Sequence, residues 1–304
     1  MTVSTRVRPD VATIVAAVVA DRRTLPPPRA TYRLQLNHTF TFRDATAIVP
    51  YLAELGVSHV YASPIFQAAA GSLHGYDVVD YGHLNAEIGT PEDFARLVEA
   101  LHAHNMGLVV DFVPNHMGID RGQNAWWQDV IEHGQLSRFA ETFDIDWSPL
   151  KGELTGKVLL PFLGDQYGDV LDRGELVLAF TDGAFAIRYW ESSFPLDPCT
   201  WPVILQPVLD ALANELPDDH IDLLELASII TALEFLPSSH DTELPDDAVD
   251  RRYREYLVCR HRLSTLVERS SRIAELLSAA VADLNGTPED GRSFDRLDDL
   301  LNRQ

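Results

Sequence analysis

The sequence predicts an α/β fold in which short parallel strands alternate with helices. Apolar runs of strand length recur between segments with helical spacing, and the run at 108–113 is mostly apolar, as in strands covered on both faces. The chain has 304 residues, 46% of them hydrophobic, which is enough for a sizeable core. Periodicity leaves an open doubly wound sheet and a barrel both possible, but no glycine-rich phosphate loop follows these strands.

The first predicted element is an N-terminal helix. Residues 11–20 are too short to span a bilayer, and their apolar positions fall at helical spacing, namely Val11, Ile14, Val15 and Val18. Asp21 follows where a signal-peptide cleavage site prefers small residues, although Arg6 and Arg8 precede the stretch. We therefore expect an amphipathic helix, a linker at Pro26–Pro28 and a cytoplasmic protein.

Two strands and a helix follow the linker. Thr31–Leu36 alternates as a strand, and Val57–Ser63 forms the second predicted strand. Between them, apolar residues from Asp44 onward repeat at helical spacing up to Gly56. Pro50 lies inside this segment, which predicts either a kink or a later helix start.

A second helix and a third strand complete the predicted unit. Thr90 supplies an N-cap, Pro91 a first-turn proline, and Asp93 an acid three residues beyond the cap. An apolar stripe continues the helix through Phe94, Leu97, Val98 and Leu101. The third strand is Leu108–Val113.

The pattern changes after the third strand. Glu175–Phe180 and Ala184–Tyr189 are predicted strands joined by a hairpin turn at Thr181–Gly183. Helices return from about Pro202, and Ser293–Gln304 is also predicted as helix. This region is an expected insertion. Within it, Trp126 and Trp127 are adjacent on a predicted helix, so at least one of them belongs to the core.

Composition excludes several classes of function. Twenty-four Lys and Arg against 46 Asp and Glu give a net charge of −22, which argues against nucleic acid and membrane surfaces as partners. Cys199 and Cys259 lie far apart and show no zinc-ligand spacing. His102 and His104 lie on different faces of a helix. We expect no metal and no cofactor.

The first cluster with potential chemistry is Asp111–His116. Asp111 stands at the end of a predicted strand, and Asn115 and His116 lie on the loop just past it, where α/β barrels build their sites. The alternative is that Asp111 and His116 only pair with each other or with loop backbone.

The second cluster, His74–Asp77, lies on the predicted loop after the second strand. Tyr76 is suited to stack on a sugar ring, and Asp77 is suited to accept hydrogen bonds from adjacent hydroxyls. Alone, the cluster fits a glycine-based turn with a buried aromatic equally well. Together, the two clusters favour a polyhydroxylated ligand.

These two clusters also carry a family resemblance. DFVPNH (111–116) resembles the first signature of the α-amylase superfamily of glycoside hydrolases, and LHGYDVVDY (73–81) resembles the loop before it. Five further stretches resemble the maltooligosyltrehalose synthase family within it: ATYRLQLNHTFTF (30–42), SHVYASPIF (58–66), NAWWQDVIEHG (124–134), FDIDW (143–147) and KVLLPFLGDQYGDVL (157–171).

The resemblance implies the N-terminal part of a (β/α)8 TIM barrel, with about three strands and a domain inserted after the third. The implied divisions are 1–28 (helix and linker), 29–116 (first part of the barrel) and 117–304 (inserted domain and helices leading to a fourth strand). The implied reaction converts the reducing-end α-1,4 bond of a maltooligosaccharide to α,α-1,1. The implied functional partner is a maltooligosyltrehalose trehalohydrolase.

The resemblance also assigns roles to five residues. Tyr76 would stack on the glucose before the scissile bond, Asp77 would hold its hydroxyls, and His116 would bind its primary hydroxyl. Asp111 and Asn115 would be supports that fix the arginine preceding the nucleophile. The nucleophile and the acid/base are expected beyond Gln304, because a full barrel needs ~250 residues before insertions.

The chain is therefore expected to be a fragment without catalytic activity of its own. Two alternatives stay open at this point. One is another hydrolase of the α-amylase superfamily, and the other is a product that binds α-glucan without catalysis.

Overall fold

The computed structural model describes residues 10–22, 27–239, 241, 244–288 and 290–303. It contains two compact units, residues 1–118 and 119–304. The predicted linker residue Pro26 and the pair Arg6 and Arg8 lie outside the described residues.

Helix α1 (Val11–Arg22) forms at the predicted place. Its predicted amphipathic character is wrong. Valine and alanine residues surround the helix axis, and the side chains described on it, including Val11 and Ile14, are exposed.

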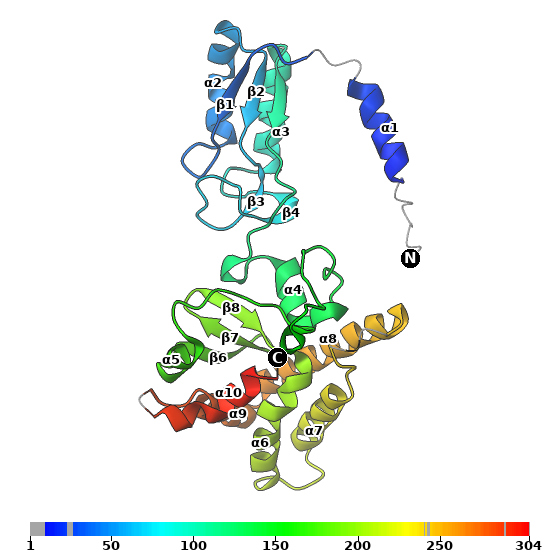
Figure 1. Cartoon of the computed structure of the whole chain (residues 1–304), viewed down its shortest axis with the longest axis vertical. Coiled ribbons are helices and arrows are strands. Elements are labelled where there is room, and N and C mark those ends of the chain that lie inside the picture. Colours follow the sequence, from blue (N-terminus) through cyan, green and yellow to red (C-terminus); the bar gives the residue numbers. More distant parts are fainter. Residues whose placement is uncertain (1–9, 23–26, 240, 242–243, 289, 304) are drawn as a thin grey trace. The chain divides into compact units, whose positions relative to one another are not determined.

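Three parallel strands form the sheet of the first unit, in the order β1 (Thr31–Leu34), β2 (His59–Ala62) and β5 (Gly107–Val110). Helices α2 (Phe42–Glu54) and α3 (Pro91–Ala103) contact each other and share one apolar core with this sheet (Figure 1). The α/β fold with about three parallel strands is confirmed.

One face of this sheet is packed and the other is open. Leu34, Val60 and Ala62 are buried in a core that also contains apolar residues of α2 and α3. The expectation that the third strand is covered on both faces is wrong, since all four residues of β5 are half-buried. Among the described strands β5 pairs only with β2, so it stands at an edge of the sheet.

Both predicted helices begin at capping boxes. Thr41 caps α2 together with Asp44, so this helix starts before the predicted Asp44 and not later. Pro50 lies inside α2, which continues to Glu54. Thr90 and Asp93 cap α3 as the sequence indicates.

The predicted long loop after the second strand contains a second small sheet. Strands β3 (Phe66–Ala68) and β4 (Val78–Leu84) pair antiparallel, with irregular register between Phe66 and Ala68. The loop that joins them carries His74–Asp77 and is closed by backbone hydrogen bonds such as Ala69 N to Asp77 O, 3.0 Å.

The second unit consists of a small antiparallel sheet and helices. The predicted hairpin is confirmed as β6 (Leu176–Thr181) and β7 (Ala184–Tyr189), and a third strand, β8 (Ser192–Pro195), extends it. The helices are α4 (Ala125–His133), α5 (Tyr167–Asp172), α6 (Trp201–Ala213), α7 (Ile221–Glu234), α8 (Asp246–Arg269), α9 (Ser271–Leu284) and α10 (Asp295–Leu301). Five short 3-10 turns are η1 (Asp120–Gly122), η2 (Gly134–Leu136), η3 (Gly152–Leu154), η4 (Pro198–Thr200) and η5 (Gly291–Phe294).

Trp127 is buried in this unit, as expected for one of the paired tryptophans. Its neighbour Trp126 is half-buried and stacks on Phe139, with ring centroids 5.2 Å apart. No disulfide joins the two cysteines: Cys199 and Cys259 are both free.

Candidate functional site

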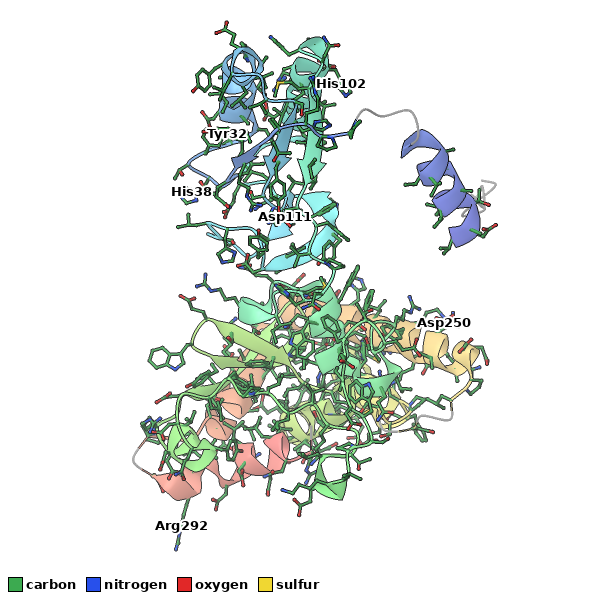
Figure 2. The ribbon with its side chains drawn as sticks, turned by 45° about the horizontal axis from the view of Figure 1, so that its top comes forward. Tyr32, His38, His102, Asp111, Asp250 and Arg292 are labelled. Atoms are coloured by element: carbon green, nitrogen blue, oxygen red, sulfur yellow. The ribbon has the colours of Figure 1, made fainter. Side chains whose placement is uncertain are left out.

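The open face of the parallel sheet brings charged and aromatic side chains together. Arg33 and Tyr61 are register partners on neighbouring strands, and side chains on one face repeat every second residue, so both lie opposite the packed core. Asp111 follows the last residue of β5, where Figure 2 labels it. The Arg33 guanidinium lies over the Tyr61 ring, 4.4 Å from its centroid.

Asp111 is the centre of this cluster. Its Oδ2 accepts hydrogen bonds from Tyr76 Oη at 2.5 Å, Arg33 Nη1 at 2.9 Å and Tyr61 Oη at 3.0 Å. The hydrogen bond from Tyr76, together with those from Arg33 and Tyr61, lowers the pKa of Asp111 although burial opposes this. The Asp111 side chain is therefore a carboxylate near neutral pH, and it fixes the positions of three other side chains.

The same contacts act on the donors. Burial disfavours the charged form of Arg33, but its hydrogen bonds with Tyr76 and Asp111 outweigh this effect and raise its pKa. The hydrogen bond to Asp111, with a contribution from burial, raises the pKa of Tyr61. The cluster is a carboxylate neutralised by a guanidinium, and the Tyr61 phenol beside it keeps its proton near neutral pH.

Tyr76 reaches this cluster because of the turn that precedes it. Gly75 has φ +75°, and a Cβ there would lie 3.1 Å from the Pro64 carbonyl oxygen, so the turn favours glycine. The Tyr76 hydroxyl also accepts a hydrogen bond from Arg33 Nη2 at 2.9 Å. The predicted glycine-based turn and the contact with Asp111 thus occur together, although Tyr76 is half-buried and not buried.

The other predicted site residues lie near Tyr76 and differ in the contacts that their side chains make. Asp77 accepts a hydrogen bond from Ser72 Oγ at 2.5 Å, and its Oδ1 is 3.7 Å from His74 Nδ1. His116 Nε2 lies 3.1 Å from the carbonyl oxygen of Tyr76. Asn115 is exposed on the loop.

These contacts exclude a pair between Asp111 and His116, while His116 does make the loop-backbone contact that the alternative describes. Asp111 and His116 do not pair: Asp111 binds side chains of the sheet and of the β3–β4 loop, whereas His116 contacts loop backbone. Within this chain Asp111 binds Arg33, whereas its expected support of the arginine that precedes the nucleophile stays a prediction.

Sequence reasoning missed Arg33 and Tyr61. The available signal was an arginine at a polar position of the alternating segment 31–36, directly before the apolar Leu34. A charged residue at that place needs a buried or half-buried partner. The identity of the partner was not accessible, because Asp111 lies 78 residues away.

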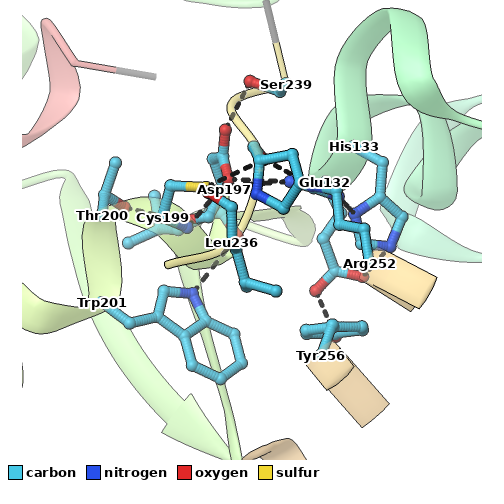
Figure 3. A network of polar contacts seen from close by, with 12 residues as sticks. Glu132, His133, Asp197, Cys199, Thr200, Trp201, Leu236, Ser239, Arg252 and Tyr256 are labelled. Carbon is cyan, nitrogen blue, oxygen red and sulfur yellow. Dashed lines mark hydrogen bonds and ion pairs between the residues drawn. The ribbon is translucent and has the colours of Figure 1, made fainter. Parts of the chain in front are cut away.

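The second unit holds a separate buried polar network (Figure 3). Arg252 on α8 is fully buried and donates to Pro237 O at 2.9 Å and to Asp197 Oδ1 at 3.3 Å. Its Nη1 lies 2.9 Å from Nδ1 of the buried His133, and Ser239 Oγ donates to Asp197 Oδ2 at 2.5 Å. The network joins α4, α8 and the turn at η4.

Burial shifts the titration of two neighbouring groups in this network. It raises the pKa of Glu132 to about 7, although the hydrogen bond from Tyr256 Oη at 2.5 Å favours the carboxylate. Burial, reinforced by Arg252, lowers the pKa of His133 to about 3. At neutral pH the imidazole is uncharged and accepts a hydrogen bond from the guanidinium.

The described residues contain no group of three or more His, Cys, Asp and Glu side chains placed to hold a metal ion. Within those same ranges, every helix is too short or too polar to cross a membrane.

Comparison with known proteins shows what the first half of the chain is similar to. Residues 42–169 match the family model described as alpha amylase, catalytic domain. A putative maltooligosyl trehalose synthase of Mycobacterium tuberculosis is 43% identical over 172 residues, which cover 52% of this chain and 22% of that protein. An intracellular maltogenic amylase of Bacillus subtilis is 41% identical over 100 residues, covering 33% of this chain and 16% of that protein.

A solved structure agrees with these matches. The maltooligosyltrehalose synthase from Arthrobacter ramosus superposes with a TM-score of 0.50 at 44% identity, covering 57% of this chain and 22% of that one. The chain spans about a fifth of the length of these synthases. The resemblance stated from the strand-end motifs is confirmed, as is the fold class of a partial α-amylase-type barrel.

Proposed function

We propose that this chain is part of a maltooligosyltrehalose synthase. The reaction moves the reducing-end glucose of a maltooligosaccharide from an α-1,4 to an α,α-1,1 bond, which makes the enzyme an isomerase acting by intramolecular glucosyl transfer. The observation that carries this proposal is the 43% identity over 172 residues with a protein named as such a synthase. The substrate is accordingly a maltooligosaccharide.

In the proposed enzyme, residues of the first unit bind and position the glucose before the scissile bond. Tyr76 offers its ring face to the glucose before the scissile bond, while its hydroxyl is held by Asp111 and Arg33. Asp77 accepts hydrogen bonds from that sugar's hydroxyls, and His116 binds its primary hydroxyl. Asp111 and Asn115 are positioning residues. The contacts of Asp111 support this role, because they fix the tyrosine that carries the ring.

The covalent chemistry belongs to carboxylates outside this chain. A retaining transfer needs a nucleophile and an acid/base on opposite sides of the glycosidic bond. We place both beyond Gln304, and we place residues 29–116 in the catalytic barrel and 117–304 in an inserted domain. The proposal also includes a cytoplasmic location and a trehalohydrolase that consumes the product.

The test uses the complete gene product with maltopentaose as substrate. The synthase reaction adds no water, so reducing ends disappear while the number of glucose units per molecule stays constant. Mass spectrometry and a reducing-end assay on the same samples measure the two quantities. Release of glucose and shorter reducing oligosaccharides as the only products would replace the synthase with an amylase-type hydrolase.

A further inference from the structure

Two strained residues line one cavity of the second unit. Among the described residues, the non-glycine residues with positive φ are Asn105, Arg121, Asp182 and Trp190. Asn and Asp tolerate this conformation, whereas a bulky side chain rarely adopts it. Arg121 (φ +60°) and Trp190 (φ +52°) both line a cavity of about 590 Å³, a volume within the range of small-molecule sites.

Trp190 is unusual in both conformation and exposure. With Glu191 it forms the two-residue turn between β7 and β8, where glycine would relieve the strain. Its side chain is nevertheless an indole that is 77% exposed. Strain of this kind persists where surrounding contacts fix the conformation, and strained residues cluster at functional sites.

The Trp190 ring is held in place before any ligand binds. Its Nε1 donates to Glu175 Oε2 at 3.3 Å, and Glu175 Oε1 accepts from Arg173 Nε at 2.5 Å. The ring meets the buried Tyr189 edge-on, with centroids 6.4 Å apart and planes at 85°. A fixed aromatic face loses little conformational entropy on binding.

The polar groups beside this ring suit a neutral ligand with several hydroxyls. Arg121 Nε lies 3.0 Å from Glu191 Oε2, and both side chains are more than half exposed. The guanidinium donates and the carboxylate accepts hydrogen bonds, which matches vicinal hydroxyls. The carboxylate is already neutralised, which disfavours a cation, and the net charge of −22 disfavours an anion.

We propose that this cavity binds a glucosyl unit of an α-1,4-glucan, with the pyranose ring on Trp190 and its hydroxyls on Arg121 and Glu191. Phe162 and Phe194, whose rings are 4.3 Å apart, form the apolar wall. The choice of an α-glucan rests on the proposed function. The existence of a saccharide site rests on the strained tryptophan and its polar neighbours.

The test is a binding titration of the 304-residue chain with maltopentaose, followed by tryptophan fluorescence and calorimetry. We expect saturable binding that Trp190→Ala weakens by about tenfold or more and that Trp190→Phe largely retains. Phe235→Ala is the matched control, since Phe235 is 81% exposed but does not line the cavity, and its affinity should equal that of the unchanged chain.

Trp190→Gly distinguishes binding lost through removal of the ring from binding lost through misfolding. It removes the ring and relieves the positive φ, so we expect a higher melting temperature together with lost binding. Unchanged affinity in Trp190→Gly, or no binding by the unchanged chain, would overturn the site. Tighter binding of cellopentaose than of maltopentaose would overturn the choice of an α-glucan.

These outcomes are distinct from those of the function test. Trehalose-ended products from the complete gene product, with no maltopentaose binding at Trp190, would contradict this inference alone. Binding through Trp190 in a protein that only hydrolyses maltopentaose would support the cavity and contradict the synthase proposal alone.

Discussion

His116 and Tyr76 are the residues whose proposed roles can be separated most cleanly by kinetics. In the complete enzyme, His116→Ala should lower kcat more than it raises KM, because its hydrogen bond to the primary hydroxyl strengthens as charge and ring distortion develop. The loss is worth ~0.5–1.5 kcal/mol or more in a dry site. Steady-state kinetics on maltopentaose measure the split between the two constants.

Tyr76→Ala is the comparison variant for this prediction. It removes a stacking surface that ground state and transition state use alike, so a larger share of its loss should be in KM. A near-normal kcat in His116→Ala, with an intact fold by circular dichroism, would remove His116 from the sugar site. The role assigned to the whole 111–116 signature would then have to be withdrawn.

Glu132 makes the stability of the second unit depend on pH. Its folded pKa of about 7 lies above the ordinary value, so the folded state binds the extra proton and stability falls as pH rises toward and through about 7. His133 acts oppositely: its folded pKa of about 3 makes stability rise between about 3 and its ordinary value near 6.5. Above pH 6.5, of these two groups only Glu132 still makes the stability of the second unit depend on pH.

Urea unfolding at pH 6.5 and pH 8 tests this prediction. All five tryptophans lie between residues 126 and 201, so their fluorescence reports on the second unit alone. The free energy of unfolding should fall with pH by less than ~1.4 kcal/mol per pH unit, the limit for one proton, and Glu132→Gln should remove the decrease. A decrease that persists in Glu132→Gln belongs to another group.

At the scale of elements, Arg252 ties α4 and α8 to the turn at η4. Arg252→Ala leaves the Asp197 carboxylate and the His133 imidazole without their guanidinium, and removing one partner of a buried ion pair costs about 3–5 kcal/mol. Arg251→Ala is the matched control on the same helix. Arg251 is largely exposed and pairs with Asp247 at 3.1 Å, which is worth less than ~1 kcal/mol.

Urea unfolding followed by tryptophan fluorescence measures both arginine variants. Equal losses in Arg251→Ala and Arg252→Ala would show that the buried network does not stabilise the second unit.

Elements with local signals were predictable, and those that depend on distant partners were not. Thr90 and Asp93 form the predicted capping box within four residues. Pro50 was harder to interpret, because sequence shows the missing N–H but not the packing that keeps α2 continuous around it. Asp197 and His133, two side-chain partners of Arg252, lie 55 and 119 residues away, so no local pattern indicates them.

In the candidate site, too, the features with local sequence signals were predictable and the contacts between distant residues were not. The carboxylate at the end of β5 and the Tyr76 loop were predictable from strand ends and from the family motif. Their contact depends on β3 and β4, which sequence reasoning described as a loop, since β3 has only three residues and an irregular register with β4. The third strand of the second sheet, β8, was missed for the same reason: it has four residues and follows a strained turn.

At the scale of the whole chain, the first unit presents a sheet with one packed face. Arg33 and Tyr61 are half-buried on the other face, and Phe112, just beyond β5, is 57% exposed. In a (β/α)8 barrel this face turns inward and is covered by residues from the other strands. The residues that we propose to bind sugar therefore accompany a sheet that the described strands leave open at β1 and β5.

This arrangement leads to a prediction for the 304-residue chain on its own. Purified and incubated with maltopentaose, it should show no detectable turnover, because a retaining transfer cannot form its glycosyl-enzyme without the nucleophile that we place beyond Gln304. The complete gene product, assayed in parallel at equal concentration, is the positive control. Any trehalose-ended product from the isolated chain would mean that its own carboxylates perform the transfer, and Asp77 and Asp111 would then be the first to replace by Asn.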